Sequence, residues 1–231
     1  MTRIEDMTGL GERLAVTAAA YDAASARYAE FVKGELQELP LDRAVLAAFA
    51  EHVLAEGGGL VAEAGCGTGR IGAHLAAAGL DVFGVDLSPA LVGIARATYP
   101  GLRVSVASMH ALPVRDAALG GIVAWYSVIH AAPGDVPGYF AEFARVLRPG
   151  GFALAAFFEA VGEPVTGFAH GVTPAYRWPL DALAALAGEA GLVEVGRMSR
   201  EPRPGERFRR GHLLLRRRSA APSPDGVNSG A

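Results

Sequence analysis

Short apolar segments alternate with amphipathic ones along most of the 231-residue chain. Continuous apolar runs predict buried strands, the first beginning at Leu60 and the others at residues 80–85, 102–107, 121–127 and 152–157. Apolar residues at helical spacing predict helices at residues 41–56, 70–78, 136–147 and 181–190, with Asp42 as a possible cap of the first. Ser88 before Pro89 caps one more helix. Strands that alternate with helices predict an α/β fold whose mostly parallel sheet has helices on both faces.

The two ends of the chain depart from this alternation. Residues 192–198 and 208–216 predict two strands joined by a short connection, so the last strand must be antiparallel. The expected sheet therefore has seven strands. Residues 11–33 predict one or two amphipathic helices within an N-terminal segment, 1–40, that precedes the domain at 41–218, and residues 219–231 read as a disordered tail.

Composition narrows the class of protein. The chain has 51% hydrophobic and 19% charged residues and a net charge of −3, which is ordinary for one soluble globular domain. No overall basic character indicates nucleic acid, and neither a signal peptide nor a membrane span is evident, so we expect a cytoplasmic protein. A single cysteine, Cys66, and histidines without short mutual spacing predict no metal site.

The sequence LVAEAGCGTGR at residues 60–70 predicts a cofactor-binding turn. A buried strand ends in an acid, Glu63, and in glycines at 65, 67 and 69 that permit positive φ and close approach of a ligand to the backbone. The amides at the next helix start favour polar or anionic ligand groups, and Asp86 ends the second strand, where a carboxylate can accept bonds from ribose hydroxyls. Gly67, Gly69 and Gly72 also satisfy the dinucleotide fingerprint GxGxxG, so glycine spacing alone leaves NAD open.

An acid followed by alternating glycines resembles the first motif of the class I S-adenosylmethionine-dependent methyltransferases, and LRPGG before the fifth strand is a second feature of that family. The closing hairpin is a third. The resemblance covers roughly residues 47–216 and implies S-adenosylmethionine as cofactor. It implies that the glycines hold the amino acid end, Asp86 the ribose, and Ser108 with Met109 the adenine, although the family commonly has an acid at the position of Ser108. The cofactor-binding residues that it implies are Glu63, Gly65, Cys66, Gly67, Gly69, Asp86, Leu87, Ser108, Met109 and Tyr126. Arg70 faces either a cofactor carboxylate or solvent.

Residues after the fourth strand are candidates for acceptor chemistry. The family places groups facing the transferring methyl here, and the sequence WYS instead of a proline-rich pair disfavours adenine or amide nitrogen as acceptor. His130 is the candidate general base, because an ordinary imidazole is largely neutral at cytoplasmic pH; a hydrogen bond to the cofactor or a turn is the alternative.

The glycine- and proline-rich segment 159–179 reads either as a substrate-facing insertion or as a packed loop that anchors the next helix. The side chains of this segment that could bind an aromatic or anionic acceptor are His170, Tyr176, Arg177 and Trp178. The candidate substrate-binding residues are Tyr21, Trp125, His130, Tyr176, Arg177 and Trp178. Tyr21 lies on the N-terminal segment, which often covers the cofactor in this family. The alternative role for Tyr21 is packing in the core.

The resemblance implies an enzyme that transfers a methyl group from S-adenosylmethionine to a small-molecule acceptor, with oxygen favoured. An NAD(P)-binding oxidoreductase is the weaker alternative, since the chain has little room for a separate substrate domain. A protein that binds S-adenosylmethionine without transferring the methyl group also remains open.

Overall fold

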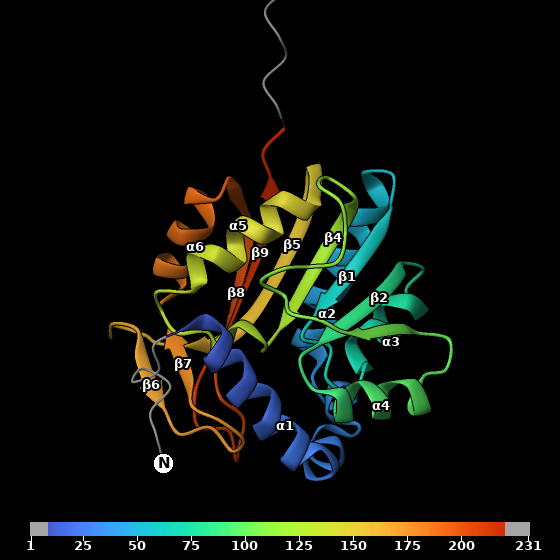
Figure 1. Cartoon of the computed structure of the whole chain (residues 1–231). Helices are drawn as coiled ribbons and strands as arrows, with labels where there is room; N and C mark the ends of the chain where they lie inside the picture. The colour runs from blue at the N-terminus through green and yellow to red at the C-terminus, as the bar shows by residue number, and fades with distance from the viewer. Residues whose placement is uncertain (1–8, 220–231) are drawn as a thin grey trace, which may run out of the picture.

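The computed structural model describes residues 9–219 and shows a three-layer α/β arrangement (Figure 1). Its parallel strands run in the spatial order β3, β2, β1, β4, β5, the order of a doubly wound sheet. The strands are β1 (Leu60–Ala64), β2 (Asp81–Asp86), β3 (Arg103–Val106), β4 (Leu119–Trp125), β5 (Leu147–Glu159), β6 (Thr166–Phe168), β7 (Ala175–Trp178), β8 (Leu192–Arg200) and β9 (Arg210–Arg217). The helices are α1 (Leu10–Val32), α2 (Pro40–Ala55), α3 (Arg70–Ala77), α4 (Pro89–Thr98), α5 (Val136–Val146) and α6 (Leu180–Glu189), with short 3₁₀ turns η2 (Glu35–Glu38) and η3 (Val128–His130).

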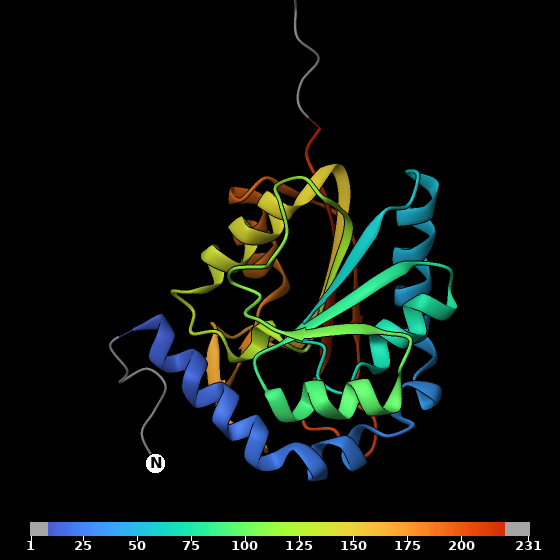
Figure 2. The ribbon, with the colours of Figure 1, turned by 45° about the vertical axis from the view of Figure 1, so that its right-hand side comes forward.

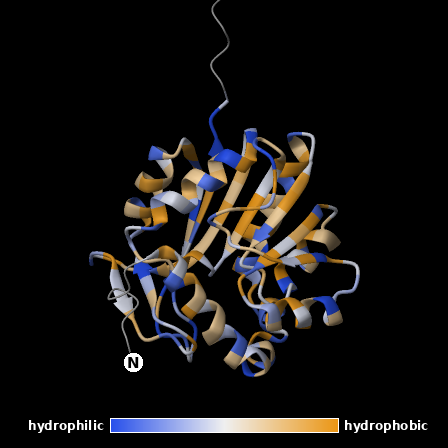
Figure 3. Ribbon diagram, in the orientation of Figure 1, coloured by the Kyte–Doolittle hydropathy of each residue, from blue (hydrophilic) through white to orange (hydrophobic). Residues whose placement is uncertain are grey.

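Each face of the sheet packs against its own set of helices. One apolar cluster joins α5 and α6 to inward residues such as Ala62 and Ile122, and the other joins α2, α3 and α4 to Val61 and Val123. Neighbouring residues on one strand thus enter opposite clusters, as the strand period requires. Strands buried on both faces read as continuous apolar runs, which is the pattern that Figure 3 shows in the centre of the sheet.

The closing hairpin completes the sheet as expected. Strand β9 lies antiparallel between β5 and β8, with Leu154 opposite Leu214 and Met198 opposite His212. The α/β fold with an antiparallel last strand is confirmed.

All seven expected strands are present, and residues 159–179 add two more. Residues 159–179 form a further hairpin in which β6 pairs antiparallel with β7, and β7 pairs with Phe158 and Glu159 at the end of β5, giving a nine-stranded sheet. The alternation of Tyr176 and Trp178 toward the core was hidden by the flanking glycines and prolines. Asp42 was also assigned wrongly as a cap: Leu39 occupies that position, and Asp42 lies buried with Oδ2 3.0 Å from Nε of Arg200.

Helix α1 is a single helix that runs past the carboxyl ends of the strands and beside α4 (Figure 1 and Figure 2). Because those strand ends carry the loops with the candidate site residues, α1 covers the functional end of the sheet. No helix within residues 9–219 combines the length and apolar character needed to cross a bilayer.

Candidate functional site

The turn after β1 depends on glycine at each predicted position. Gly65, Gly67 and Gly69 have φ values of 76°, 52° and 78°, in the region that side chains disfavour. A Cβ at Gly65 would lie 2.4 Å from Cβ of Ser127, so the ends of β1 and β4 approach one another only because residue 65 has no side chain. Glu63 lies beneath this turn, where its Oε2 accepts a hydrogen bond of 2.7 Å from the amide of Gly72.

Asp86 ties the ends of β1 and β2 together. Its carboxylate accepts hydrogen bonds from the amide of Gly67 at 2.7 Å and from the amide of Ser88 at 2.9 Å. Ser88, and not Asp86, caps α4, because its Oγ accepts from the amide of Leu91. Burial raises the pKa of Asp86, while the surrounding backbone amides lower it. A carboxylate has about four lone-pair sites, so Asp86 keeps acceptor capacity for a ligand.

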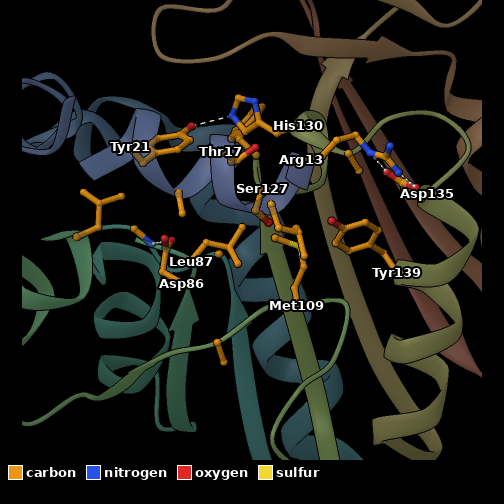
Figure 4. Close-up of a pocket in the computed structure, with 18 of the residues that line it drawn as sticks. Arg13, Thr17, Tyr21, Asp86, Leu87, Met109, Ser127, His130, Asp135 and Tyr139 are labelled. Carbon is orange, nitrogen blue, oxygen red and sulfur yellow. Dashed lines mark hydrogen bonds and ion pairs between the residues drawn. The ribbon is translucent and has the colours of Figure 1, made fainter. Parts of the chain in front are cut away.

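A cavity of about 780 Å³ opens between this turn and α1 (Figure 4). This volume includes the part of the cavity that is open to solvent. The cavity is lined by Leu10, Arg13, Leu14, Thr17, Ala18, Tyr21, Tyr28, Gly65, Gly67, Asp86, Leu87, Leu91, Ala107, Met109, Trp125, Tyr126, Ser127, His130, Ala131, Asp135 and Tyr139. The lining is mixed, with a carboxylate at one end, an imidazole at the other and apolar side chains between them.

Polar contacts of Arg13 and Asp22 help to hold α1 over the cavity. At one end, Nε and Nη2 of Arg13 donate to the two carboxylate oxygens of Asp135 at 2.8 and 2.7 Å, a bidentate pair visible in Figure 4. At the other, Oδ1 of Asp22 accepts from the Ser88 hydroxyl and from the amide of Ala90. These contacts link α1 to the N-terminal ends of both α5 and α4.

His130 lies beneath α1 with both ring nitrogens engaged. Nδ1 is 2.9 Å from the carbonyl oxygen of Pro174, which can only accept, so Nδ1 carries the proton. Nε2 is 2.7 Å from the hydroxyl of Tyr21 (Figure 4) and therefore accepts the phenolic proton. Burial lowers the pKa of His130 to about 4, so the ring is neutral near pH 7.

Tyr126 forms part of the wall between two cavities. It follows β4 with a φ of 53°, uncommon for a residue with a side chain, and its amide donates to the carbonyl of Ala156 at 2.9 Å. Its ring lines the cavity under α1 and a second cavity behind it, as do Tyr28 and Trp125. Burial raises the pKa of the Tyr126 phenol, so it remains a hydrogen-bond donor.

The structure brings most of the predicted residues to the first cavity. Those that line it are Tyr21, Gly65, Gly67, Asp86, Leu87, Met109, Trp125, Tyr126 and His130. Among the others, Glu63 supports the turn, Cys66 is buried, with its Sγ 2.8 Å from where a Cβ at Gly84 would lie, and Gly69 is the N-cap of α3. Ser108 lies outside the lining, and its Oγ accepts from the amide of His110 at 3.1 Å.

The candidates on the insertion do not reach this cavity. Tyr176 and Trp178 are 3% and 2% exposed and pack in the cluster of α5 and α6, because side chains two apart on β7 share its inner face. Arg177 points the other way, with Nη2 2.6 Å from Oε2 of Glu163 and its guanidinium over the ring of Phe208. The burial of Tyr176 and Trp178 favours the second interpretation of residues 159–179, a packed segment, and none of the three side chains lines the cavity that holds His130.

Several lining residues went unrecognised in the sequence. Arg13, Leu14, Thr17 and Ala18 come from one face of α1, and Asp135 and Tyr139 from the start of α5. Residues 10, 13, 14, 17, 18 and 21 have helical spacing, so the sequence could have identified them as one face of α1. The spacing does not indicate which part of the protein that face contacts. Within residues 9–219, no three His, Cys, Asp or Glu side chains gather as metal ligands.

The fold and this site define an α/β protein whose glycine turn and β2 carboxylate lie at the carboxyl ends of the parallel strands, where doubly wound sheets bind their ligands. Residues 61–151 match the family described as methyltransferase domain, so this part of the chain is a class I S-adenosylmethionine-dependent methyltransferase domain.

The chain is similar to curated relatives in sequence and to a solved structure in fold. A probable S-adenosylmethionine-dependent methyltransferase of Mycobacterium tuberculosis is 30% identical over 141 residues, which are 58% of this chain and 49% of the relative. Magnesium-protoporphyrin O-methyltransferase of Rhodobacter capsulatus is 36% identical over 88 residues, covering 37% and 39% of the two chains. The chain spans between 35% and 49% of the length of the curated relatives that it matches. In fold, it is similar to the 1,6-didemethyltoxoflavin-N1-methyltransferase of Burkholderia thailandensis, with a TM-score of 0.70, 22% identity and 92% of each chain covered.

Proposed function

We propose that the protein transfers the methyl group of S-adenosylmethionine to a small-molecule acceptor, with oxygen as the favoured acceptor atom. The observation that carries this proposal is one continuous cavity that joins the glycine turn and Asp86 to the imidazole of His130. The matched relatives named above act on oxygen in one case and nitrogen in another, so the acceptor atom rests on this chain's own residues.

The residues of the first cavity fit S-adenosylmethionine. Asp86 offers a buried carboxylate to ribose hydroxyls, and Leu87 and Met109 offer apolar surfaces for the adenine. Beside Asp86, the amide-rich turn meets Tyr28, whose ring lies 3.5 Å from where a Cβ at Gly67 would be. Arg70 lines the neighbouring second cavity, and its Nη1 is buried without a hydrogen-bond partner among the described residues, which supports a role for Arg70 in binding the cofactor carboxylate.

The cofactor, when bound, supplies a methyl group already activated on a sulfonium. The protein therefore has to align an acceptor and exclude water, and α1 is placed to do both. We assign residues 9–40, the described part of segment 1–40, as a lid over the cofactor; this part includes α1. Residues 1–8 of that segment and residues 220–231 of the expected tail lie outside the described residues.

His130 would take the acceptor proton at Nε2, because Nδ1 is already protonated toward Pro174. Its pKa of about 4 keeps the imidazole neutral but makes it a weak base at equilibrium. His130 would first accept a hydrogen bond from the acceptor hydroxyl. It would then take the hydroxyl proton as the acceptor oxygen forms its bond to the methyl carbon, because bond formation makes that hydroxyl more acidic. Tyr21 occupies Nε2 in the structure, so an acceptor hydroxyl either displaces the Tyr21 hydroxyl or passes its proton through it.

Calorimetric titration with S-adenosylmethionine, S-adenosylhomocysteine and NAD tests the cofactor. Micromolar binding of the first two supports the proposal, and binding of NAD alone overturns it in favour of an oxidoreductase. Acceptor-dependent release of S-adenosylhomocysteine then separates an enzyme from a protein that only binds the cofactor. A His130→Ala variant should lose about 100-fold in kcat, and unchanged turnover at every pH would remove the base assignment.

A further inference from the structure

The cavity under α1 extends beyond the residues that are proposed to hold the cofactor. Its further part comes from one face of α1, from the η3 turn and from the start of α5. We call it the His130 region, and its residues are Leu14, Thr17, Tyr21, His130, Ala131 and Tyr139. Figure 4 shows the pair of Arg13 and Asp135 beside Tyr139, on the side of the cavity away from Asp86. No group of the cofactor is proposed to bind in the His130 region, so it is the part of the cavity that is left for a second ligand.

The His130 region adjoins the turn that is proposed to receive the cofactor. The hydroxyl of Ser127 donates to the carbonyl of Ala64 at 2.6 Å, and a Cβ at Gly65 would lie 2.4 Å from Cβ of Ser127. The η3 turn starts at the next residue, Val128, and ends at His130. Gly65, Ser127 and His130 all line the same cavity. An acceptor beside His130 would therefore share one cavity with the cofactor, as alignment for methyl transfer requires.

The charged side chains that line this cavity already have partners. They are Arg13, Asp86 and Asp135. Arg13 and Asp135 form their bidentate pair at 2.8 and 2.7 Å, and the two side chains are only 18% and 16% exposed. Asp86 accepts from two backbone amides and is proposed to bind the ribose. Among residues 9–219, the lining of this cavity thus offers no unpaired charge to an acceptor.

The titratable side chains of the His130 region are uncharged near pH 7. Burial lowers the pKa of His130 to about 4, so the imidazole is neutral. Burial raises the pKa of Tyr139 to about 12 and also raises the pKa of Tyr21, so both phenols keep their protons. The rings of Tyr21 and His130 lie 5.4 Å apart at 76°. Aromatic rings that line a cavity favour a flat, largely apolar ligand.

This region should discriminate between acceptors by their charge. A charged acceptor would lose its water without gaining a partner of opposite charge, and burying an unpaired ion is costly. An uncharged hydroxyl compound loses only hydrogen bonds to water, which Nε2 of His130 or the hydroxyl of Tyr21 can replace. The uncharged compound is therefore the better ligand.

We propose that the methyl acceptor is an uncharged phenol that binds in the His130 region, and that the pairing of Arg13 with Asp135 makes this region selective against charged acceptors. This inference rests on the proposed function. In the reaction, the bond between the methyl carbon and sulfur breaks, with its electron pair remaining on sulfur. A bond from that carbon to the phenol oxygen forms. The hydroxyl proton passes to Nε2 of His130, directly or through the hydroxyl of Tyr21, so the imidazole gains the positive charge that the sulfonium loses.

Calorimetry on the protein saturated with S-adenosylhomocysteine tests the acceptor class. The probes are 4-hydroxybenzyl alcohol, 4-hydroxybenzoate and 4-hydroxybenzylamine, which share the phenol ring and are uncharged, anionic and cationic. We expect the alcohol to bind at least about 10-fold more tightly than either charged probe. Equal affinity for the three probes, tighter binding of a charged probe, or no binding of any of them would overturn the proposal.

The matched variants are Asp135→Asn and Glu163→Gln. Each removes the carboxylate partner of one arginine, since Asp135 pairs with Arg13 in the cavity lining and Glu163 pairs with Arg177 outside it. Asp135→Asn leaves Arg13 without its bidentate carboxylate, so the preference for the alcohol over 4-hydroxybenzoate should fall about 10-fold. Glu163→Gln should keep this preference. An unchanged preference in Asp135→Asn would refute the role of the pair.

Arg13→Gln makes the opposite change and serves if Asp135→Asn fails to fold. It leaves Asp135 without its guanidinium partner, so the affinity for 4-hydroxybenzylamine should rise about 10-fold relative to that for the alcohol. An unchanged ratio of these two affinities would also refute the role of the pair. Failure of the unmodified protein to bind S-adenosylhomocysteine would instead refute the proposed function, whereas binding of S-adenosylhomocysteine without a preference among the probes would refute the acceptor class alone.

Discussion

The two halves of the site are assembled in different ways. In the cofactor half, Glu63 reaches Gly72, nine residues away, and Asp86 reaches Gly67, 19 residues away. In the other half, which surrounds His130, Tyr21 forms a hydrogen bond with His130, 109 residues away in the chain, and Arg13 pairs with Asp135, 122 residues away. The first half is formed by consecutive elements, namely β1, the glycine turn, α3 and β2. The second half forms only when α1, η3 and the insertion pack together.

The halves also differ in how burial affects their ionisable groups. Burial raises the pKa of Glu63 to about 8, against the effects of the Gly72 amide and Arg70. Burial lowers the pKa of His130 to about 4. Both shifts favour the uncharged form, as expected in a low dielectric.

The largest expected effect is on the cofactor half. Asp86→Ala removes the acceptor for two backbone amides together with the proposed ribose contact, so affinity for S-adenosylmethionine should fall about 100- to 1000-fold, or about 3–4 kcal/mol. The control is Asp81→Ala at the other end of β2, where the carboxylate is exposed and pairs with Arg103. Calorimetry should show loss in the first variant alone; equal affinities would refute the role of Asp86.

Gly65→Ala tests whether the contact between β1 and β4 joins the two halves. The new Cβ would lie 2.4 Å from Cβ of Ser127, so we expect a loss of unfolding free energy of about 3 kcal/mol. Gly79→Ala has the same kind of positive φ but no atom within 4 Å, and it should lose about 1 kcal/mol. Urea denaturation measures both, and similar losses would mean that the close approach is unimportant.

The dependence of stability on pH should have opposite sign in the two halves. Between its usual pKa of 4.5 and about 8, Glu63 binds more protons in the native than in the unfolded state, so its effect lowers stability as pH rises. Between about 4 and 6.5, His130 binds fewer protons in the native state, so its effect lowers stability as pH falls.

Glu63→Gln and His130→Gln isolate these contributions. Relative to the unmodified protein, Glu63→Gln should gain roughly 3–4 kcal/mol between pH 5 and pH 8, and His130→Gln should gain about 2 kcal/mol between pH 6.5 and pH 4.5. Denaturation at a series of pH values measures the differences. Difference curves of the same sign would contradict burial as the common cause.

The smallest expected effect is on the lid. Arg13→Gln replaces the bidentate pair with Asp135, whose side chains are 18% and 16% exposed, so cofactor affinity should fall about fivefold, or about 1 kcal/mol. Lys33→Gln removes a positive charge just beyond the end of the same helix, where the side chain is exposed, and should leave affinity unchanged. Stopped-flow measurement should place the difference in cofactor release, and equal release rates would show that this pair does not hold the lid.

Local patterns accounted for the α/β fold, the closing hairpin and the residues around the glycine turn. They failed at residues 159–179, where glycines and prolines concealed β6 and β7, and at Tyr176 and Trp178, whose aromatic side chains support the core instead of lining the cofactor cavity. An aromatic residue in an irregular segment has no periodicity that separates these two roles.

By itself, the sequence determined that β1 must end in a turn with positive φ and that a carboxylate must follow β2, because only glycine tolerates that backbone and because strand ends lie close in a parallel sheet. Only the tertiary structure decided which face of α1 covers the cavity, which nitrogen of His130 is free to accept a proton, and that a second cavity lies behind Tyr126. Those features depend on contacts such as Tyr21 with His130 and His130 with Pro174. Contacts between residues so far apart in the chain form through packing of whole elements, and no local pattern encodes them.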